Sequence, residues 1–336
     1  MEKKFYAIKN KNNDIRMKSS SGGVFYEIAK WVINNNGIVY GAIYDDKNNV
    51  VHYRATKKDE LTAFYGSKYV QSNIGKSYEY AKQDLENGRI VLFSGTPCQI
   101  NAVKNLTKNI NSGKLYLVDI ICHGTPQIKY YNDYKRYIEK KYKSNIKNIN
   151  MRYKNKKRYI KNIQSNNVSD NIIEPHIMRF EFENKSVIEE GSQFNEYYQL
   201  FDYFLNPGCF KCPFSNLNRN SDITIGDFHT FKTNLKEFND GNGVSLVILN
   251  SDKGETLLNN IKDNFYIIEK KEKECYQPAI YGPTDKPDNY DQFCIDYEKY
   301  GFEYVIKKYR NKGLKYNIKK VLYKLGIYDI LKKLKK

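Results

Sequence analysis

Six cysteines are the residues of this chain best suited to metal or redox chemistry. Cys209 and Cys212 form a C-x-x-C motif, and two thiolates at that spacing can bind one tetrahedral metal ion or one iron–sulfur cluster. A zinc ribbon needs a second C-x-x-C motif, which the sequence lacks. Two single cysteines must therefore complete any four-thiolate site. The candidates are Cys98, Cys122, Cys275 and Cys294.

The elements around Cys98 and Cys122 favour these two. Residues 90–93 and 115–121 are short apolar segments, and each is followed by a turn that contains a cysteine and then by a helical pattern. This β-α-β-α order predicts parallel strands, whose carboxyl ends lie at one edge of a sheet where ligands bind. We therefore expect Cys98 and Cys122 to lie near each other, whereas Cys275 and Cys294 stand in unpatterned sequence.

Two polar segments are candidate walls of a pocket at that edge. Residues 19–23, Ser-Ser-Ser-Gly-Gly, precede an amphipathic helix, and the free N–H groups and dipole there favour an anion such as phosphate. Ordinary helix capping explains the same residues equally well. Residues 66–72 combine a cation, Lys68, with an aromatic ring, Tyr69, and could bind a phosphate and a ring system or form a simple loop.

The remaining pattern predicts an α/β fold: a mixed sheet with a parallel β-α-β core and a basic C-terminal helix. Residues 38–44 and 50–54 are expected to form two strands joined by a turn. Residues 143–175 are basic and Asn-rich, which indicates a loop or insertion. We expect one domain over 1–300 and a basic amphipathic tail over 301–336.

The formal net charge of +18 is concentrated in two segments. Residues 135–161 hold 12 Lys and Arg against one acidic residue, and residues 301–336 hold 12 against two. The rest of the chain is nearly neutral, which argues against a nucleic-acid-binding coat. The lysine-rich tail has apolar residues at helical spacing, so it fits either an anionic membrane surface or packing on the domain.

The first ten residues, MEKKFYAIKN, contain no apolar signal segment, and no apolar run approaches the roughly 18 residues that span a bilayer. We expect a cytoplasmic protein, peripheral to the inner face of the membrane if the tail binds lipid. In a reducing compartment the cysteines are expected to be ligands, catalytic thiols or buried apolar residues.

Six unusual sequence motifs follow one another over residues 19–230. They are SSSGGVFYEIA, YGSKYVQS, VLFSGTPCQI, VDIICHGTP, CFKC and SDITIGDF. This series resembles the coenzyme F420 hydrogenase/dehydrogenase beta-subunit family, in the C-terminal form without the N-terminal ferredoxin segment. The resemblance implies a redox protein with a 4Fe-4S cluster and FAD, or FMN in its place. A flavin can exchange a hydride with a coenzyme or substrate and single electrons with a cluster.

The resemblance also implies roles for particular residues. The cluster ligands would be Cys98, Cys122, Cys209 and Cys212. The residues that would bind the flavin are Ser21, Gly22, Gly23, Ser67, Lys68, Tyr69, Gln71 and Ser72. Arg219 and Asp227 would line the reaction pocket as catalytic residues.

One departure from the family pattern concerns the electron acceptor. The family motif is GDFW, whereas this chain has His229 in place of the tryptophan. This difference leaves open whether coenzyme F420 is the electron acceptor. The partner would be a redox protein or a small electron carrier. Related chains stand beside bacterial surface-polysaccharide genes, so a sugar-linked substrate is another candidate.

Three other functions remain open from the sequence. The four cysteines could staple a metal-stabilised scaffold without redox activity. A glycan-processing transferase could use His123 or Asp227 as its base. A Cys–His hydrolase built on Cys122 and His123 is a further interpretation, although no third partner is evident.

Overall fold

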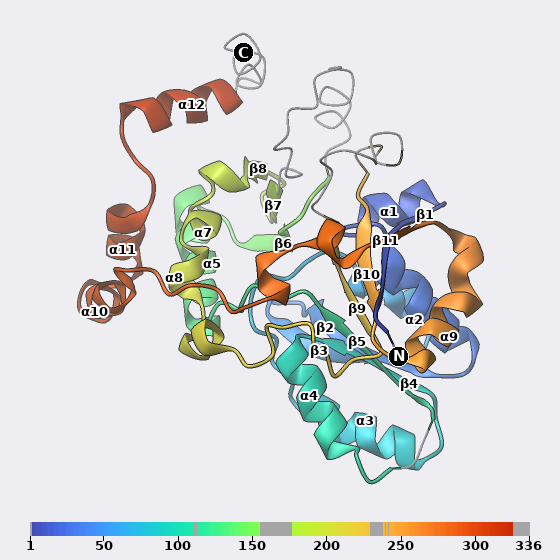
Figure 1. Cartoon of the computed structure of the whole chain (residues 1–336). Coiled ribbons are helices and arrows are strands. Elements are labelled where there is room, and N and C mark those ends of the chain that lie inside the picture. The colour runs from blue at the N-terminus through green and yellow to red at the C-terminus, as the bar shows by residue number, and fades with distance from the viewer. Residues whose placement is uncertain are drawn as a thin grey trace.

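The computed structural model describes residues 2–110, 113–154, 177–228, 238, 240 and 242–324. Its largest element is an eight-stranded sheet (Figure 1). The strands of this sheet are β1 (Lys4–Asn10), β2 (Ile38–Tyr44), β3 (Val50–Ala55), β4 (Val91–Gly95), β5 (Leu115–Ile120), β9 (Ile223–Asp227), β10 (Ser245–Leu249) and β11 (Phe265–Lys270). Their order across the sheet is β11-β1-β10-β9-β5-β4-β2-β3.

The centre of this sheet is parallel and its flanks are antiparallel. β2, β4, β5 and β9 run parallel to one another, whereas β3, β10, β1 and β11 pair in the antiparallel sense. The mixed sheet with a parallel β-α-β core is therefore confirmed. The hairpin of β2 and β3 also lies where the sequence places it. The sequence analysis did not identify β1 or β11.

Helices cover both faces of the sheet because its central strands alternate buried side chains between two clusters. Val39 and Leu92 pack in a cluster with α2 (Val24–Asn34) and α9 (Asp252–Ile261). Their neighbours Ile38 and Val91 pack in another cluster with α3 (Ser77–Glu86) and α4 (Pro97–Leu106). Successive side chains of a strand point to opposite faces of the sheet. Helices α2 and α9 therefore cover one face, and α3 and α4 cover the other.

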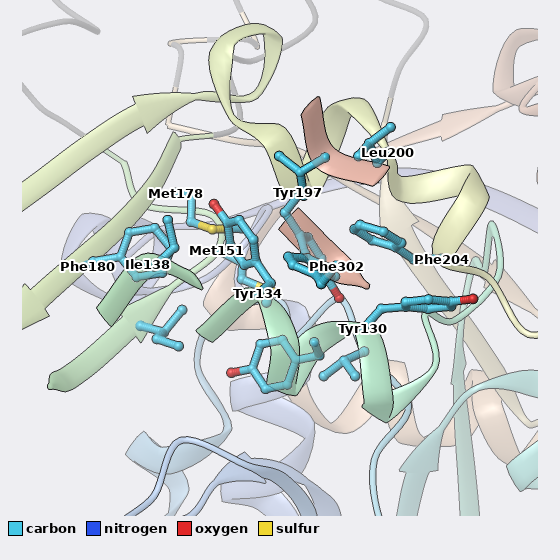
Figure 2. Close-up of a cluster of buried hydrophobic side chains, with 14 of the residues drawn as sticks. Tyr130, Tyr134, Ile138, Met151, Met178, Phe180, Tyr197, Leu200, Phe204 and Phe302 are labelled. Atoms are coloured by element: carbon cyan, nitrogen blue, oxygen red, sulfur yellow. The ribbon is translucent and has the colours of Figure 1, made fainter. Parts of the chain in front are cut away.

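A second, three-stranded sheet lies against an aromatic cluster (Figure 2). Tyr130, Tyr134, Tyr197, Phe204 and Phe302 gather there, and each is nearly or fully buried. The elements around this cluster are β6 (Ile146–Asn150), β7 (Ile177–Phe182), β8 (Val187–Gly191), α5 (Ile128–Tyr142), α7 (Glu196–Gln199), α8 (Phe201–Phe204), α10 (Tyr290–Tyr300) and α11 (Phe302–Tyr309).

The described parts of the two basic segments contribute buried residues to the core, which their charge did not predict. The expected loop over 143–175 contains β6, whose Ile146 and Ile149 are buried in the aromatic cluster; residues 155–175 lie outside the described residues. The expected tail begins with α11, because Phe302, Val305 and Ile306 complete the same core. The basic helix itself is α12 (Leu314–Lys324), and residues 325–336 lie outside the described residues. No helix in the described ranges has the length and hydropathy to cross a membrane.

The serine-glycine segment before α2 packs against the paired strands β1 and β10 where Ile8 lies opposite Ser245. The backbone N–H of Gly22 donates to Ser245 Oγ (2.9 Å), and its carbonyl accepts from the N–H of Asn10 (2.8 Å). A Cβ on Gly22 would lie 2.3 Å from the Ile8 carbonyl oxygen, which real Cβ atoms do not approach. Glycine is therefore required at this position by packing on β1 and β10.

We predict that Gly22→Ala destabilises the protein by at least about 2 kcal/mol, because backbone atoms must move to admit the methyl group. Urea unfolding measures this loss. Gly282→Ala is the matched control, since no atom lies within 4 Å of its added Cβ, and it should change stability by less than about 0.5 kcal/mol. Equal stability of the two variants would contradict the packing role of Gly22.

Candidate active site

A cavity of about 420 Å³ lies at the carboxyl edge of β4, β5 and β9. The cavity is lined at the three strand ends by Ser94, Ile121 and Asp227. Much of the remaining wall consists of residues 19–21, 23–26 and 64–72. The pocket therefore lies where the parallel strands and the two polar segments predict it. Its volume is within the range of about 300–1,000 Å³ that small-molecule and cofactor sites occupy.

The beginning of α2 forms one wall of the cavity. Gly23 is the N-cap in a left-handed conformation (φ 84°), and no side chain caps the helix. Ser21 Oγ donates away from the helix, to the Val244 carbonyl (2.7 Å). Val24, Phe25 and Tyr26 line the cavity. The positive end of the helix dipole is thus available to an anionic group of a ligand, while Gly22 does not line the cavity.

Hydrogen bonds connect the segment 66–72 to Ser20, Met151 and Tyr197. Ser67 Oγ donates to Ser20 Oγ (2.8 Å), which joins the two predicted walls. The N–H of Tyr69 bonds to Met151 Sδ (3.1 Å), and its carbonyl accepts from Tyr197 Oη (2.7 Å). These contacts connect the cavity to the aromatic cluster.

Lys68 does not present a free charge to a phosphate as the sequence analysis expected. Its ammonium donates to the carbonyls of residues 63–66 at 3.0–3.3 Å, around the end of the short helix η1 (Asp59–Phe64). Burial lowers its pKa to about 7. The unpaired carbonyls at a helix C-terminus attract a cation. Lys68 therefore stabilises the conformation of residues 63–66 in the cavity wall.

A directional hydrogen-bond chain joins this wall to the start of α4. His52 Nε2 lies 3.0 Å from the Ser94 carbonyl, which can only accept, so His52 Nδ1 accepts from Ser72 Oγ (2.8 Å). Ser72 Oγ accepts from Gln99 Nε2 (2.9 Å), and Gln99 Oε1 accepts from the Thr96 N–H (3.0 Å). Burial lowers the pKa of His52 to about 4, so the ring is neutral. His52 was not predicted as a site residue, because a lone histidine in a strand belongs to no motif.

Three of the proposed cluster ligands, Cys98, Cys209 and Cys212, influence the fourth, Cys122. Burial raises the pKa of Cys122 to about 12, and charge on Cys98, Cys209 and Cys212 acts in the same direction. All three thiols are therefore near enough to interact with Cys122. Cys98 and Cys122 also line the cavity. Cys275 is buried in a separate cluster, and Cys294 packs beside the aromatic cluster.

Hydrogen bonds hold the C-x-x-C loop against the loop that contains Cys122. Asn206 donates its backbone N–H (3.0 Å) and its side-chain Nδ2 (2.9 Å) to the Thr125 carbonyl. Its Nδ2 also donates to Gln71 Oε1 (2.9 Å). At Gly124, an added Cβ would lie 3.3 Å from Cys209 Cβ. The approach of the two loops thus depends on a small residue.

In the described ranges, no three His, Cys, Asp or Glu side chains surround the position of a single metal ion. A 4Fe-4S cluster is larger than one ion, so its four thiolates bind separate iron atoms and need not share one centre. All six cysteines are free thiols. Four cysteine thiolates are the ligand set that a 4Fe-4S cluster takes.

Arg219 takes a different position from the expected one. It is not among the residues that line the cavity, because its guanidinium is buried against Asp119, with Nη1 3.4 Å from Oδ2. Burial raises the pKa of Asp119, and the Arg219 charge opposes that rise. A buried carboxylate requires such a partner. Arg219 thus supports the end of β5.

Asp227 does line the cavity, and its charge is paired with Arg152. The Arg152 side chain is 7% exposed and also lines the cavity. Nearby, Lys154 Nζ donates to the carbonyls of Arg16, Ser21 and Asn242 at 2.8–2.9 Å. Neither cation was predicted as a site residue, because both belong to a run of basic residues that is typical of a solvated loop.

The hydrolase interpretation of Cys122 and His123 is not supported by their surroundings. His123 Nε2 lies 3.1 Å from Asp202 Oδ1 on an exposed surface. Burial raises the pKa of the Cys122 thiol, whereas a nucleophilic cysteine needs a lowered pKa. His229, the departure from the family motif, lies outside the described residues.

We predict that Arg152→Gln and Asp227→Asn each destabilise the protein by about 1–3 kcal/mol, since each removes one member of a largely buried ion pair. The double variant should recover part of this loss in a double-mutant cycle of urea unfolding. Arg136→Gln removes an exposed partner of Asp133 and should cost less than about 1 kcal/mol. Additive losses in the double variant would show that the pair is not coupled.

We also predict a pH-dependent stability that originates at His52. The unfolded chain takes up this proton near pH 6.5 and the folded chain near pH 4, so the free energy of unfolding falls as the pH drops between these values. The full effect is about 3 kcal/mol. His52→Gln should flatten this dependence in urea titrations, and His123→Gln should leave it unchanged. The same slope in wild type and His52→Gln would refute the assignment.

Comparison with known proteins supports the sequence resemblance. Residues 88–274 match a family model that describes the C terminus of the coenzyme F420 hydrogenase/dehydrogenase beta subunit. The fold is similar to a chain of the xenon-derivatised F420-reducing NiFe hydrogenase complex from Methanosarcina barkeri, with a TM-score of 0.52 and 15% identity. The similarity covers 80% of this chain and 82% of that chain and bears on the fold alone. No curated protein matches the chain. Since the family match spans more than half of the sequence, the chain belongs to the coenzyme F420 hydrogenase/dehydrogenase beta-subunit family.

Proposed function

We propose that the protein is a flavin-dependent iron–sulfur oxidoreductase, with one 4Fe-4S cluster on Cys98, Cys122, Cys209 and Cys212 and a flavin in the cavity. One observation carries this proposal: Cys98 and Cys122 belong both to the group of four thiols and to the cavity wall. A group in the cavity would therefore be in direct contact with two cluster ligands. That arrangement suits electron transfer between them.

The cavity wall offers each part of a flavin a suitable environment. The uncapped start of α2 at Gly23 would face phosphate, and the rings of Phe25 and Phe64 provide apolar wall. Ser20 and Ser67, joined by a hydrogen bond, would bring polar groups to the same end. FAD and FMN both fit this description. When bound, a flavin supplies exchange between a hydride and single electrons.

Arg152 and Asp227 are the charged pair that would face the reacting part of the cavity. The Lys68 ammonium donates its hydrogen bonds to backbone carbonyls, and the His52 ring is neutral, so neither offers a free charge to a ligand. Arg152 would orient an electron-rich ring or an anionic substrate, and Asp227 would hold the guanidinium in place. Neither residue needs to change its protonation state in this role.

Two observations support the choice of electron partners: the family to which the chain belongs, and the exposure of one of the four cysteines. Cys98 is exposed, so a cluster there would be accessible to a redox protein or a small carrier. The similar chain of known structure belongs to a hydrogenase complex, which agrees with a protein partner. Coenzyme F420 or a sugar-linked substrate of surface-polysaccharide synthesis would exchange the hydride. The free thiols fit a cytoplasmic location.

Purification without oxygen tests this function. We expect about four iron and four labile sulfide per chain, together with one releasable flavin. Cys122→Ser should lose the iron and retain its flavin-binding fold, whereas Cys294→Ser should keep both groups because Cys294 lies outside the thiol group. Full iron content in Cys122→Ser would contradict the cluster assignment. Zinc without iron or flavin in the wild-type protein would favour a metal-stabilised scaffold instead.

A further inference from the structure

Three apolar residues of helix α12 are exposed to solvent, while Leu322 is half-buried. Leu314, Ile318 and Val321 are 78%, 51% and 55% exposed. Their spacing of i, i+4 and i+7 places them in one stripe along the helix. Figure 1 shows α12 at the edge of the molecule, beyond α7 and away from the eight-stranded sheet. We call these three residues the apolar stripe.

The other side of α12 is attached to the protein by polar contacts. Tyr316 Oη accepts a hydrogen bond from Gln199 Nε2 (2.8 Å). Lys320 Nζ donates to the Phe194 carbonyl (3.0 Å) and lies 3.7 Å from a carboxylate oxygen of Glu190. A surface helix normally buries its apolar face and exposes its polar face. Here the contacts fix the reverse orientation, so the apolar stripe is directed outward.

The charge of α12 indicates what covers the apolar stripe. The helix sequence, LKYNIKKVLYK, contains four lysines and no acidic residue. Lysines beside an apolar stripe are typical of helices that lie in the interface of an anionic bilayer. A second copy of the chain would bring the same positive charge to the contact, which disfavours self-association through this surface.

We propose that α12 attaches the protein to an anionic lipid surface. The apolar stripe enters the boundary between headgroups and acyl chains, and the positive charge of the helix, with Lys319 exposed beside the stripe, attracts the anionic headgroups. Eleven residues of helix are about 16 Å long, which is too short to cross the hydrocarbon core and suits a helix in the membrane plane. Tyr316 and Lys320 hold the helix on the body of the protein during this contact.

Sedimentation with vesicles tests the proposal on the full chain. The probes are phosphatidylcholine vesicles with and without phosphatidylserine. We expect partition onto the phosphatidylserine vesicles alone, and its loss at about 1 M salt, where the Debye length is about 3 Å. Ile318→Ser/Val321→Ser should weaken partition about tenfold or more. The matched control is Tyr80→Ser/Leu106→Ser, which removes two side chains of similar exposure (45% and 42%) on α3 and α4 and should bind as the wild type does.

A second variant, Lys315→Gln/Lys319→Gln, tests the charge while keeping the apolar stripe and Lys320. It should also lose partition, and its thermal unfolding should match that of the wild type. Unchanged partition of either helix variant overturns the proposal, as does equal binding to vesicles without phosphatidylserine. A dimer that Ile318→Ser/Val321→Ser dissociates, without vesicle binding by the wild type, would assign the apolar stripe to a second copy.

Discussion

The parallel pairing of β4 with β5 is the constraint on which the candidate site depends. Gly95 at the end of β4 is in register with Asp119 near the end of β5, so the turns that follow begin side by side. Those turns carry Cys98 and Cys122. Antiparallel pairing would put them at opposite edges of the sheet, and one cavity could not reach both.

The second constraint is the docking of the aromatic cluster onto that edge. An isolated bridge pairs Pro126 with Leu205, and Asn206 bonds to the Thr125 carbonyl, which brings the C-x-x-C loop to the Cys122 turn. Arg152 and Lys154 reach from the strand region of β6 to Asp227 and to the serine-glycine segment. The basic segment thus supplies buried cations that join the two sheets at the cavity.

The sequence predicts well those features that neighbouring residues determine. The helix after Gly23, the β2–β3 hairpin and the β4-α4-β5 unit follow from apolar periodicity and turn residues, and the parallel rule then locates the cavity. The roles of Lys68 and Gly22 were not predictable in this way. A lysine beside serines suggests a phosphate site, but carbonyls two to five residues earlier compete for the same ammonium. At Gly22 the close contacts are with Ile8 and with Ser245, and the second of these lies 223 residues later.

Long-range pairing explains the other differences. β1 forms its ladder with β10 and β11 from the far end of the chain, and no local pattern specifies those partners. The Arg152–Asp227 pair joins residues 75 positions apart. Residue type therefore identifies which groups can do chemistry, whereas topology decides which of them meet. The roles of the four cysteines and of the flavin-binding residues stay predictions.

Iron-edge anomalous diffraction from crystals grown without oxygen tests the central claim most directly. We expect one iron peak, surrounded by the sulfurs of Cys98, Cys122, Cys209 and Cys212, with flavin density in the adjoining cavity. An iron peak elsewhere, or flavin density separated from Cys98 and Cys122 by protein, would contradict it.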